Sequence, residues 1–416
     1  MDEQDKELPS GLRLTPLDPV FREHPHVYLD RLREVAPVLR DTEMNRLFLT
    51  RFEDVRSVLG NRALAVDPRK APPESYHRRV VMGDLDPALF EPSMLHMDDP
   101  DHKRIRGLVS QAFNQRAVEA FRPRIQEVAD QLLDAVAERD GFDVIAEYAA
   151  PLPTIVIAEM LGVDPRDQAR FKAWSDALAH VFNPRRTPEQ VAELQEAEAN
   201  LDNYFQEIVD ARRRTRGADM VSALVSAEEA SDRLSEREIM GICRLLLVAG
   251  NVTTTDLIGN AVLALLRHPD ELAKLRARPE LIRNAVEEML RYDPPVAQGG
   301  RLTLEPMEVG GVKVGAGQSL SVSLLAAGHD PAVHREPHRF DIERTDTSHL
   351  AFGGGAHFCL GAPLARAEAQ VAIATLLRRF PDLSLDPASR VEHKRIPVFN
   401  GLAELRVRTR GPHPAR

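Results

Sequence analysis

The sequence has few of the features that form disulfide bonds, span a membrane or direct a protein to secretion. Only two of its 416 residues are cysteines, Cys243 and Cys359, which excludes a disulfide-stapled extracellular scaffold. No run approaches the roughly 18 consecutive apolar residues of a membrane span. The first seven residues are mainly acidic, unlike the basic start of a secretory signal peptide. We therefore expect a cytoplasmic protein that does not associate with a membrane.

Positive charge is also in short supply. The chain has 54 Lys and Arg against 64 Asp and Glu, which gives a formal net charge of -10. Binding to a phosphate backbone usually needs a basic surface, so we expect no nucleic-acid partner. The 43% hydrophobic and 28% charged residues are typical of a globular protein that buries a sizeable core.

Helical spacing dominates the chain. Apolar residues recur every three or four positions in residues 125–139, 191–213 and 236–267. The last of these segments starts at a capping box, Ser235 with Glu238, and at 1.5 Å per residue it spans about 50 Å. Short strand patterns occur at residues 38–40 with 47–50, at 307–309 with 312–314, and at 402–408. These patterns predict a mainly α fold, with a helical bulk around one long central helix and a minor β region.

The chain shows no internal division. No linker rich in Gly or Ser and no internal repeat occurs, so we expect a single domain over residues 1–416, with loose ends at 1–11 and 411–416. Residues 65–95 are rich in Pro, Arg and Asp without periodicity, and residues 183–188 resemble them. Both segments are candidates for a mobile lid over a pocket.

The most informative segment is residues 351–361, AFGGGAHFCLG, followed by the helical pattern of residues 362–377. Cys359 therefore lies at a helix N-terminus, where backbone N–H groups and the helix dipole stabilise a thiolate. The glycines let the backbone pass close to a flat ligand. The pattern suits a thiolate metal ligand. Two alternatives are a buried structural cysteine and a zinc site of His349, His357 and Cys359, which lacks the usual second closely spaced pair.

Residues 352–361 resemble the haem-binding loop of the cytochrome P450 family, Phe-Gly-x-Gly-x-His-x-Cys-x-Gly, at every position, and Leu364, Ala365, Arg366 and Glu368 resemble its continuation. The resemblance implies a cytochrome P450 fold, a bound haem b and Cys359 as the proximal iron ligand. It also implies haem contacts for Phe352, Gly353, His357 and Gly361. Cysteinate ligation favours cleavage of the O–O bond.

The implied activity is that of a haem-thiolate monooxygenase, which inserts one oxygen atom from O2 into a hydrophobic organic substrate. No Gly-rich flavin or nicotinamide fingerprint follows a strand. Electrons from NAD(P)H are therefore expected to arrive through a ferredoxin and a ferredoxin reductase. Lys103, Arg104 and Arg366 are candidates for a basic patch that steers such an acidic partner.

The middle of the long helix, residues 249–256, reads AGNVTTTD. An interior glycine costs roughly 1 kcal/mol relative to alanine, and the threonines can simply bond back to helix carbonyls. The resemblance implies instead that Ala249 and Gly250 lie over the haem and that Thr253, aided by Thr254, guides protons to oxygen. Val252 replaces the family's usual acid at this point. Proton delivery must then use these threonines, water, Asn251, Asp256 or the substrate.

Further residues follow from the resemblance. Haem carries two propionates, and His102 and Arg106, four residues apart, match the family's propionate clamp, joined by Arg301 and His357. Glu288 and Arg291 match a structural ion pair that an arginine from a later segment, Arg339, is expected to complete. The expected substrate pocket comprises Leu245, Ala249, Ala297 and Phe399, which are small or apolar.

Two other functions stay open at this stage. A peroxide-driven or rearranging haem-thiolate enzyme would turn over without a reductase, and the loss of the acid at Val252 favours it. A haem sensor without catalysis belongs to a different class of protein. The spectrum of the reduced protein under carbon monoxide, followed by product analysis, distinguishes these functions.

Overall fold

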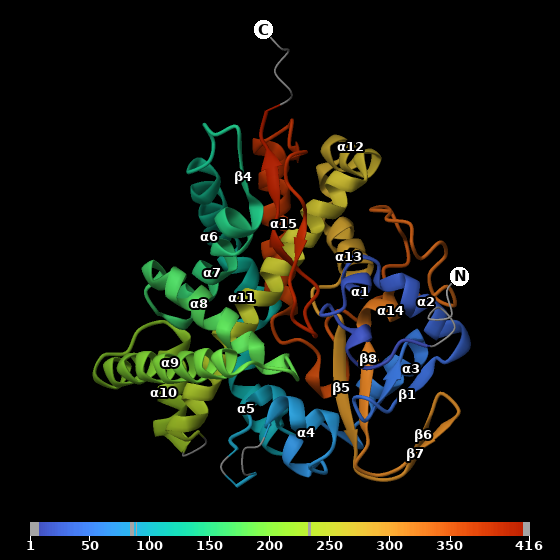
Figure 1. The fold of residues 1–416 in the computed structure, drawn as a ribbon. Helices are drawn as coiled ribbons and strands as arrows, with labels where there is room; N and C mark the ends of the chain where they lie inside the picture. The colour runs from blue at the N-terminus through green and yellow to red at the C-terminus, as the bar shows by residue number, and fades with distance from the viewer. Residues whose placement is uncertain (1–7, 84–86, 89, 232–233, 411–416) are drawn as a thin grey trace.

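The structure, a computed structural model, describes residues 8–83, 87–88, 90–231 and 234–410. The outermost residues that were predicted to be loose, 1–7 and 411–416, lie outside this range, whereas residues 8–11 lead into a short 3₁₀ turn, η2 (Gly11–Leu14). A large helical part and a smaller part built around a β-sheet lie side by side (Figure 1). The prediction of a mainly α fold with a minor β region is confirmed.

The α-helices are α1 (Pro19–Glu23), α2 (Pro25–Val35), α3 (Phe52–Gly60), α4 (Tyr76–Val81), α5 (Asp101–Val109), α6 (Gln115–Asp134), α7 (Pro151–Leu161), α8 (Gln168–Ala179), α9 (Pro188–Arg214), α10 (Met220–Ser231), α11 (Glu236–Arg267), α12 (Pro269–Ala277), α13 (Ile282–Tyr292), α14 (Leu324–Gly328) and α15 (Ala362–Arg379). The strands are β1 (Val38–Asp41), β2 (Arg46–Leu49), β3 (Leu64–Ala65), β4 (Gly141–Asp143), β5 (Gln298–Thr303), β6 (Met307–Val309), β7 (Val312–Val314), β8 (Ser319–Ser323), β9 (Ser384–Leu385), β10 (Glu392–His393), β11 (Leu402–Glu404) and β12 (Arg406–Arg408).

Helix α11 is the central element of the helical part (Figure 1). Its predicted bounds and its capping box of Ser235 and Glu238 are confirmed. It packs against α7, α8, α9 and α15, and nearly every residue from Asn251 to Leu265 is buried. By length and composition α11 could cross a membrane, but 61% of its apolar window is buried inside the protein, as in the core helix of a globular fold.

The largest sheet has the strand order β1-β2-β8-β5-β3, with β2 and β8 parallel and the other pairs antiparallel. The predicted hairpins β1–β2 and β6–β7 are confirmed. The single strand predicted at residues 402–408 is wrong, because the chain changes sheets at Leu405. Strand β11 pairs with β10, whereas β12 pairs with β4 and β9.

The two predicted lid segments meet in the fold. The first is more ordered than its composition predicts, because Ser75 caps α4 by accepting a hydrogen bond from the backbone N–H of Arg78. Arg186, from the second segment, donates to the carbonyl oxygens of Val80 and Val181 at 3.3 and 2.6 Å. One guanidinium group therefore joins the end of α4 to the turn after α8.

Candidate active site

The loop before Cys359 is held in shape by glycine and by one backbone hydrogen bond. Gly353 and Gly355 have φ angles of +70° and +65°. A Cβ atom at Gly355 would lie 2.6 Å from the carbonyl oxygen of Leu59, so a larger residue cannot fit there. The backbone N–H of Cys359 donates to the carbonyl oxygen of Phe352 at 2.9 Å. This closed loop places the cysteine just before α15, whose N-cap is Gly361.

Opposing influences act on the Cys359 thiol. Burial raises its pKa. The backbone N–H groups of Gly361 and Ala362 and the nearby cations Arg106 and Arg366 act in the opposite direction and stabilise the thiolate. A thiol in these surroundings becomes a stable thiolate when a metal ion supplies a directly bound positive charge. Cys243 differs, because it lies fully buried in the core and burial raises its pKa to about 12.

The four predicted propionate ligands converge on this loop. Arg106 donates through Nη2 to the carbonyl oxygen of Phe358 at 2.6 Å, and Arg301 donates through Nη2 to that of Gly354 at 3.4 Å. The rings of His102 and His357 lie 4.1 Å apart. Segments far apart in the chain thus bring two cations and two imidazoles together.

Two of these groups are buried without a full set of partners. Arg301 is 8% exposed, and in the described part of the chain it donates only to carbonyl oxygens. Burial lowers its pKa to about 10. The Nε2 atom of His102 is buried and has no hydrogen-bond partner among the described residues. Because buried cations need anionic partners, these residues fit a cofactor with carboxylate arms, as haem b has.

Two more histidines extend the group, and sequence reasoning missed them. His77 Nε2 lies 2.6 Å from the carbonyl oxygen of Val66, and the His77 and His96 rings lie 6.3 Å apart. Burial lowers the pKa of His96 to about 3, and His77 and His357 add to this effect. His77 lies in the segment without helical spacing, residues 65–95, and His96 directly follows it, so no periodic pattern pointed to either residue.

The threonines of α11 bond to their own helix. Thr253 Oγ1 donates to the carbonyl oxygen of Ala249 at 3.0 Å, and Thr255 Oγ1 donates to that of Asn251 at 2.9 Å. Ala249 is exposed, whereas a Cβ atom at Gly250 would lie 3.1 Å from Ile157 of α7. The close approach of α7 therefore accounts for the glycine at position 250. The contact of Gly250 with haem stays a prediction.

The acids near α11 have different environments. Asp256 is fully buried, and its Oδ1 pairs with Lys394 Nζ at 2.6 Å, whereas its Oδ2 has no hydrogen-bond partner among the described residues. Glu368, on α15, has both carboxyl oxygens buried without a hydrogen-bond partner of ordinary geometry in the described part of the chain. Burial raises the pKa of Glu368 well above its usual value, with the neighbouring Thr254 hydroxyl acting in the opposite direction. Burial therefore favours the protonated form of this carboxyl group, which lies beside α11.

An apolar cluster forms next to the exposed face of α11. It comprises Ala179, Val252 and Phe399, with the partly buried Phe182, Val248, Val296 and Ile396 around them. The predicted pocket residue Phe399 belongs to it, and its ring meets that of Phe182 edge-on at 5.4 Å. Val252 is 3% exposed and packs in the same cluster. Leu245 is partly buried and packs against the main core.

The prediction for Ala297 is wrong. Its side chain is 1% exposed and packs among Leu14, Phe48 and Leu325 in a separate cluster. Neighbouring residues of an extended chain point to opposite sides. The side chain of Val296, not that of Ala297, therefore packs against the apolar cluster of Val252 and Phe399. Val296 also forms a β-bridge with Phe399.

The predicted structural ion pair of Glu288 and Arg291, called the Glu288 brace below, is completed by an arginine other than Arg339. Glu288 and Arg291 are fully buried, and the carboxylate of Glu288 accepts hydrogen bonds from Arg291 Nε at 2.7 Å and Arg344 Nε at 3.1 Å. The prediction for Arg339 is wrong, because its side chain is 54% exposed and pairs with Glu336 and Asp341. Only the carbonyl oxygen of Arg339 contacts Arg291, at 3.2 Å.

Two further expectations also change. Arg104 pairs with Glu238, and Arg366 binds Glu287 through two contacts of 2.7 and 2.8 Å, so the basic patch is largely neutralised within the protein. The alternative zinc site is wrong as well. Both ring nitrogens of His349 are engaged, by Glu287 and by the backbone of Ala351. The one group of potential ligands found close together among the described residues lies elsewhere.

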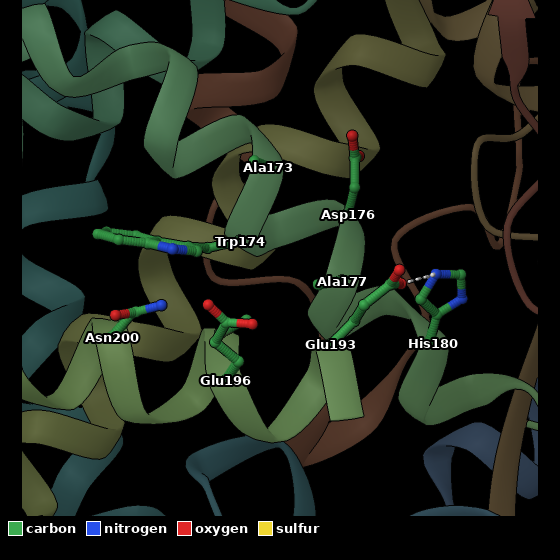
Figure 2. A pocket seen from close by; sticks show the side chains of 9 residues that line it. Ala173, Trp174, Asp176, Ala177, His180, Glu193, Glu196 and Asn200 are labelled. Carbon is green, nitrogen blue, oxygen red and sulfur yellow. Dashed lines mark ion pairs between the residues drawn. The ribbon is translucent and has the colours of Figure 1, made fainter. Parts of the chain in front are cut away.

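A separate hollow of about 290 Å³ lies between α8 and α9, lined by Trp174, His180, Glu193 and neighbouring residues (Figure 2). His180 and Glu193 form an ion pair of 3.9 Å across it. Its lining contains none of the residues predicted for the haem or the substrate pocket.

Three features define a haem-thiolate protein: a cysteine loop shaped by glycines, an apolar cluster beside a central helix, and two buried donors that lack partners within the described residues. These donors are Arg301, which donates only to carbonyl oxygens, and His102 Nε2. The family model of cytochrome P450 matches residues 43–403. Cytochrome P450 107B1 of Saccharopolyspora erythraea is 41% identical over 95% of this chain and 97% of its own length. Cytochrome P450 monooxygenase PikC of Streptomyces venezuelae is 40% identical, with 97% and 95% covered.

A solved structure of the myxobacterial cytochrome P450 CYP267B1 in complex with myristic acid superimposes with a TM-score of 0.88. It is 39% identical to this chain, over 95% of this chain and 99% of that one. This chain belongs to the cytochrome P450 family, with haem b as its cofactor and monooxygenation as its activity.

Proposed function

We propose that this chain is a cytoplasmic, single-domain monooxygenase of hydrophobic substrates, with Cys359 as the haem ligand and a ferredoxin and its reductase as the electron source. Haem b, when bound, activates dioxygen and supplies the oxygen atom that enters the substrate. The observation that carries the proposal is the convergence of the Cys359 thiol, the buried Arg301 and His102, whose Nε2 atom has no partner among the described residues, on a single loop.

Separate groups of residues hold the haem propionates, contact the porphyrin and pass protons. Arg106, Arg301, His102 and His357 hold the propionates, and the two arginines exchange their present carbonyl contacts for charge-assisted hydrogen bonds. The residues that contact the porphyrin itself are Phe352, Gly353, Gly361, Ala249 and Gly250. Thr253 and Thr254 hold and pass protons on the oxygen side, and Glu368 lies next to Thr254 as a source of protons.

The substrate class follows from the apolar cluster. Its seven side chains carry no polar atom, so the part of the substrate that reacts is an apolar chain or ring. The relative CYP267B1 was solved with myristic acid, a molecule of that kind. Arg186 holds the two lid segments together over this side of the fold, so substrate entry requires that contact to open.

The electron donor is expected to dock beside Cys359. Phe358, the preceding residue, is 43% exposed although it is aromatic, and Lys103 on α5 is exposed too. An exposed aromatic residue whose backbone contacts the cation Arg106 suits the small interface of a transient redox complex.

One experiment tests the proposal. A panel of saturated fatty acids and large hydrophobic rings is screened for spin-state shifts, and the best ligand is then incubated with NAD(P)H, ferredoxin and reductase. A product that contains one added oxygen atom and requires ferredoxin supports the proposal. Product formed only with added peroxide establishes the peroxide-driven alternative, and binding without any product in either mixture establishes a sensor.

A further inference from the structure

Three histidines far apart in the chain meet on the sheet side of the molecule, away from the cysteine loop. They are His26 on α2, His329 just after α14, and His338 in the segment that follows. Each offers a ring nitrogen, and these three atoms all lie within 4.8 Å of one another. The ring centroids are 3.9 to 5.1 Å apart. We propose that these side chains form a binding site for one zinc ion.

Polar contacts already orient two of the rings. His329 uses Nδ1 to contact the carbonyl oxygen of Leu325 at 3.2 Å, which leaves Nε2 for a ligand. His338 uses Nε2 to contact the Asp30 carboxylate at 2.9 Å, which leaves Nδ1. Contact of the second ring nitrogen with a carbonyl or a carboxylate is the usual outer-shell arrangement of a zinc-bound histidine.

The third ring lacks a partner for a buried atom. His26 Nδ1 is buried and has no hydrogen bond in the described part of the chain. A buried ring nitrogen without a partner is costly, and a metal ion removes the cost by accepting its lone pair. Zinc–nitrogen bonds of about 2.0–2.1 Å in a tetrahedron place ligand nitrogens about 3.3 Å apart. Because the three ring nitrogens lie within 4.8 Å of one another, the rings need to close by up to about 1.5 Å, and the exposed His338 can move.

The backbone next to two of the ligands is fixed. Arg291 Nη1 donates to the carbonyl oxygens of Gly328 and Pro337 at 2.7 and 2.9 Å, and these residues directly precede His329 and His338. Arg33 ties α2 to α14 through the carbonyl oxygen of Ala326 at 2.8 Å. Both arginines are paired with carboxylates, Glu288 and Asp30, so their charges are offset near a bound cation.

The site is open to solvent on one side, which gives an ion a path of entry. The His338 side chain is 50% exposed and that of Asp30 is 33% exposed. Three imidazoles with one open position, for water or Asp30, form a donor set that zinc accepts. Bound zinc would link α2 to the segment after α14 that carries His329 and His338.

The test uses the haem-loaded enzyme without a histidine tag, treated with a chelator and then titrated with zinc alone by calorimetry. Zinc and iron are counted separately by mass spectrometry after dialysis. We expect one zinc per chain, and loss of retained zinc in His338→Ala and His26→Asn. Asp30→Asn should weaken binding by about 10–100-fold, as for an outer-shell partner. His24→Ala, at an exposed histidine two residues before His26, is the control and should bind as the native chain does.

Each other outcome overturns the proposal. Failure of the native chain to retain zinc removes the site, and unchanged retention in His338→Ala means that zinc binds elsewhere. Equal loss in His24→Ala means adventitious surface binding. Because His338 is exposed, its removal leaves the core intact, and the haem spectrum of each variant confirms that it is folded.

Discussion

The brace around Glu288 allows a quantitative test of which arginine completes it. In Glu288→Gln the buried Arg291 loses its carboxylate, and breaking a buried ion pair by removal of one partner costs about 3–5 kcal/mol. At about 2.1 cal/mol/K per residue, the unfolding entropy of 416 residues is about 0.9 kcal/mol/K, so each kcal/mol shifts the midpoint by about 1.1 °C. The expected decrease in Tm is about 3–6 °C.

The two arginines then distinguish the structure from the sequence prediction. Arg344→Ala removes a 10% exposed charged donor from Glu288, which costs about 1.5–3 kcal/mol and about 2–3 °C. Arg339→Ala removes an exposed side chain and should change stability by less than about 0.5 kcal/mol. Thermal unfolding followed by circular dichroism measures all three variants. A decrease for Arg339→Ala that equals that of Arg344→Ala would refute the assignment.

Three more predictions concern the haem site. Cys359→Ser should abolish the red-shifted carbon monoxide band and the activity, whereas Cys243→Ser, in the core, should keep both; a retained band in the first variant would contradict the ligand assignment. Arg301→Gln should weaken haem retention about 10–100-fold in a transfer assay to apomyoglobin, while Arg104→Gln, whose partner is Glu238, should leave retention unchanged. His96 has a pKa lowered to about 3 by burial, so below about pH 6.5 only the unfolded state takes up its proton. Stability should therefore fall as the pH drops from 6.5 toward 3, and denaturant titrations of His96→Gln should show a shallower fall.

Local signals made the central helix and the cysteine loop predictable. The capping box at Ser235 and Glu238 and the long apolar repeat define α11 without help from the rest of the chain. The loop motif is likewise contained in residues 352–361, because its glycines serve a shape that the loop itself determines. Motifs of this kind can be read from sequence because their physical causes lie within a few residues.

The remaining site residues depend on contacts between distant segments. Whether Val296 or Ala297 lines the pocket depends on which side of an extended chain faces α11. The sequence alone does not show which of two adjacent side chains lies on that side. Arg344 reaches Glu288 only because the segment after α14 folds back over α13. The three histidines of the proposed zinc site follow no spacing rule, because each comes from a different segment.

The replacement of the usual acid by Val252 leads to the last prediction, which concerns the source of the protons. Val252 is 3% exposed in an apolar cluster, so a carboxyl group in Val252→Asp would be buried beside Phe399 and kept neutral by its raised pKa, with little access to water. That variant should therefore not improve coupling. Burial raises the pKa of Glu368, which lies next to Thr254 on the other side of α11, and so favours its protonated form.

If Glu368 supplies protons through Thr254, the isosteric Glu368→Gln should release more peroxide per NAD(P)H consumed, since positioned acids contribute about 10²–10⁴-fold to proton transfer. Thr254→Val should act in the same direction, and combining the two changes should add little, because both interrupt one path. Thr253→Ala should add to either of them. Product, peroxide and cofactor consumption are measured together in each variant. Native coupling in Glu368→Gln, or tighter coupling in Val252→Asp, would show that the proton arrives from the Val252 side of the helix and not from α15.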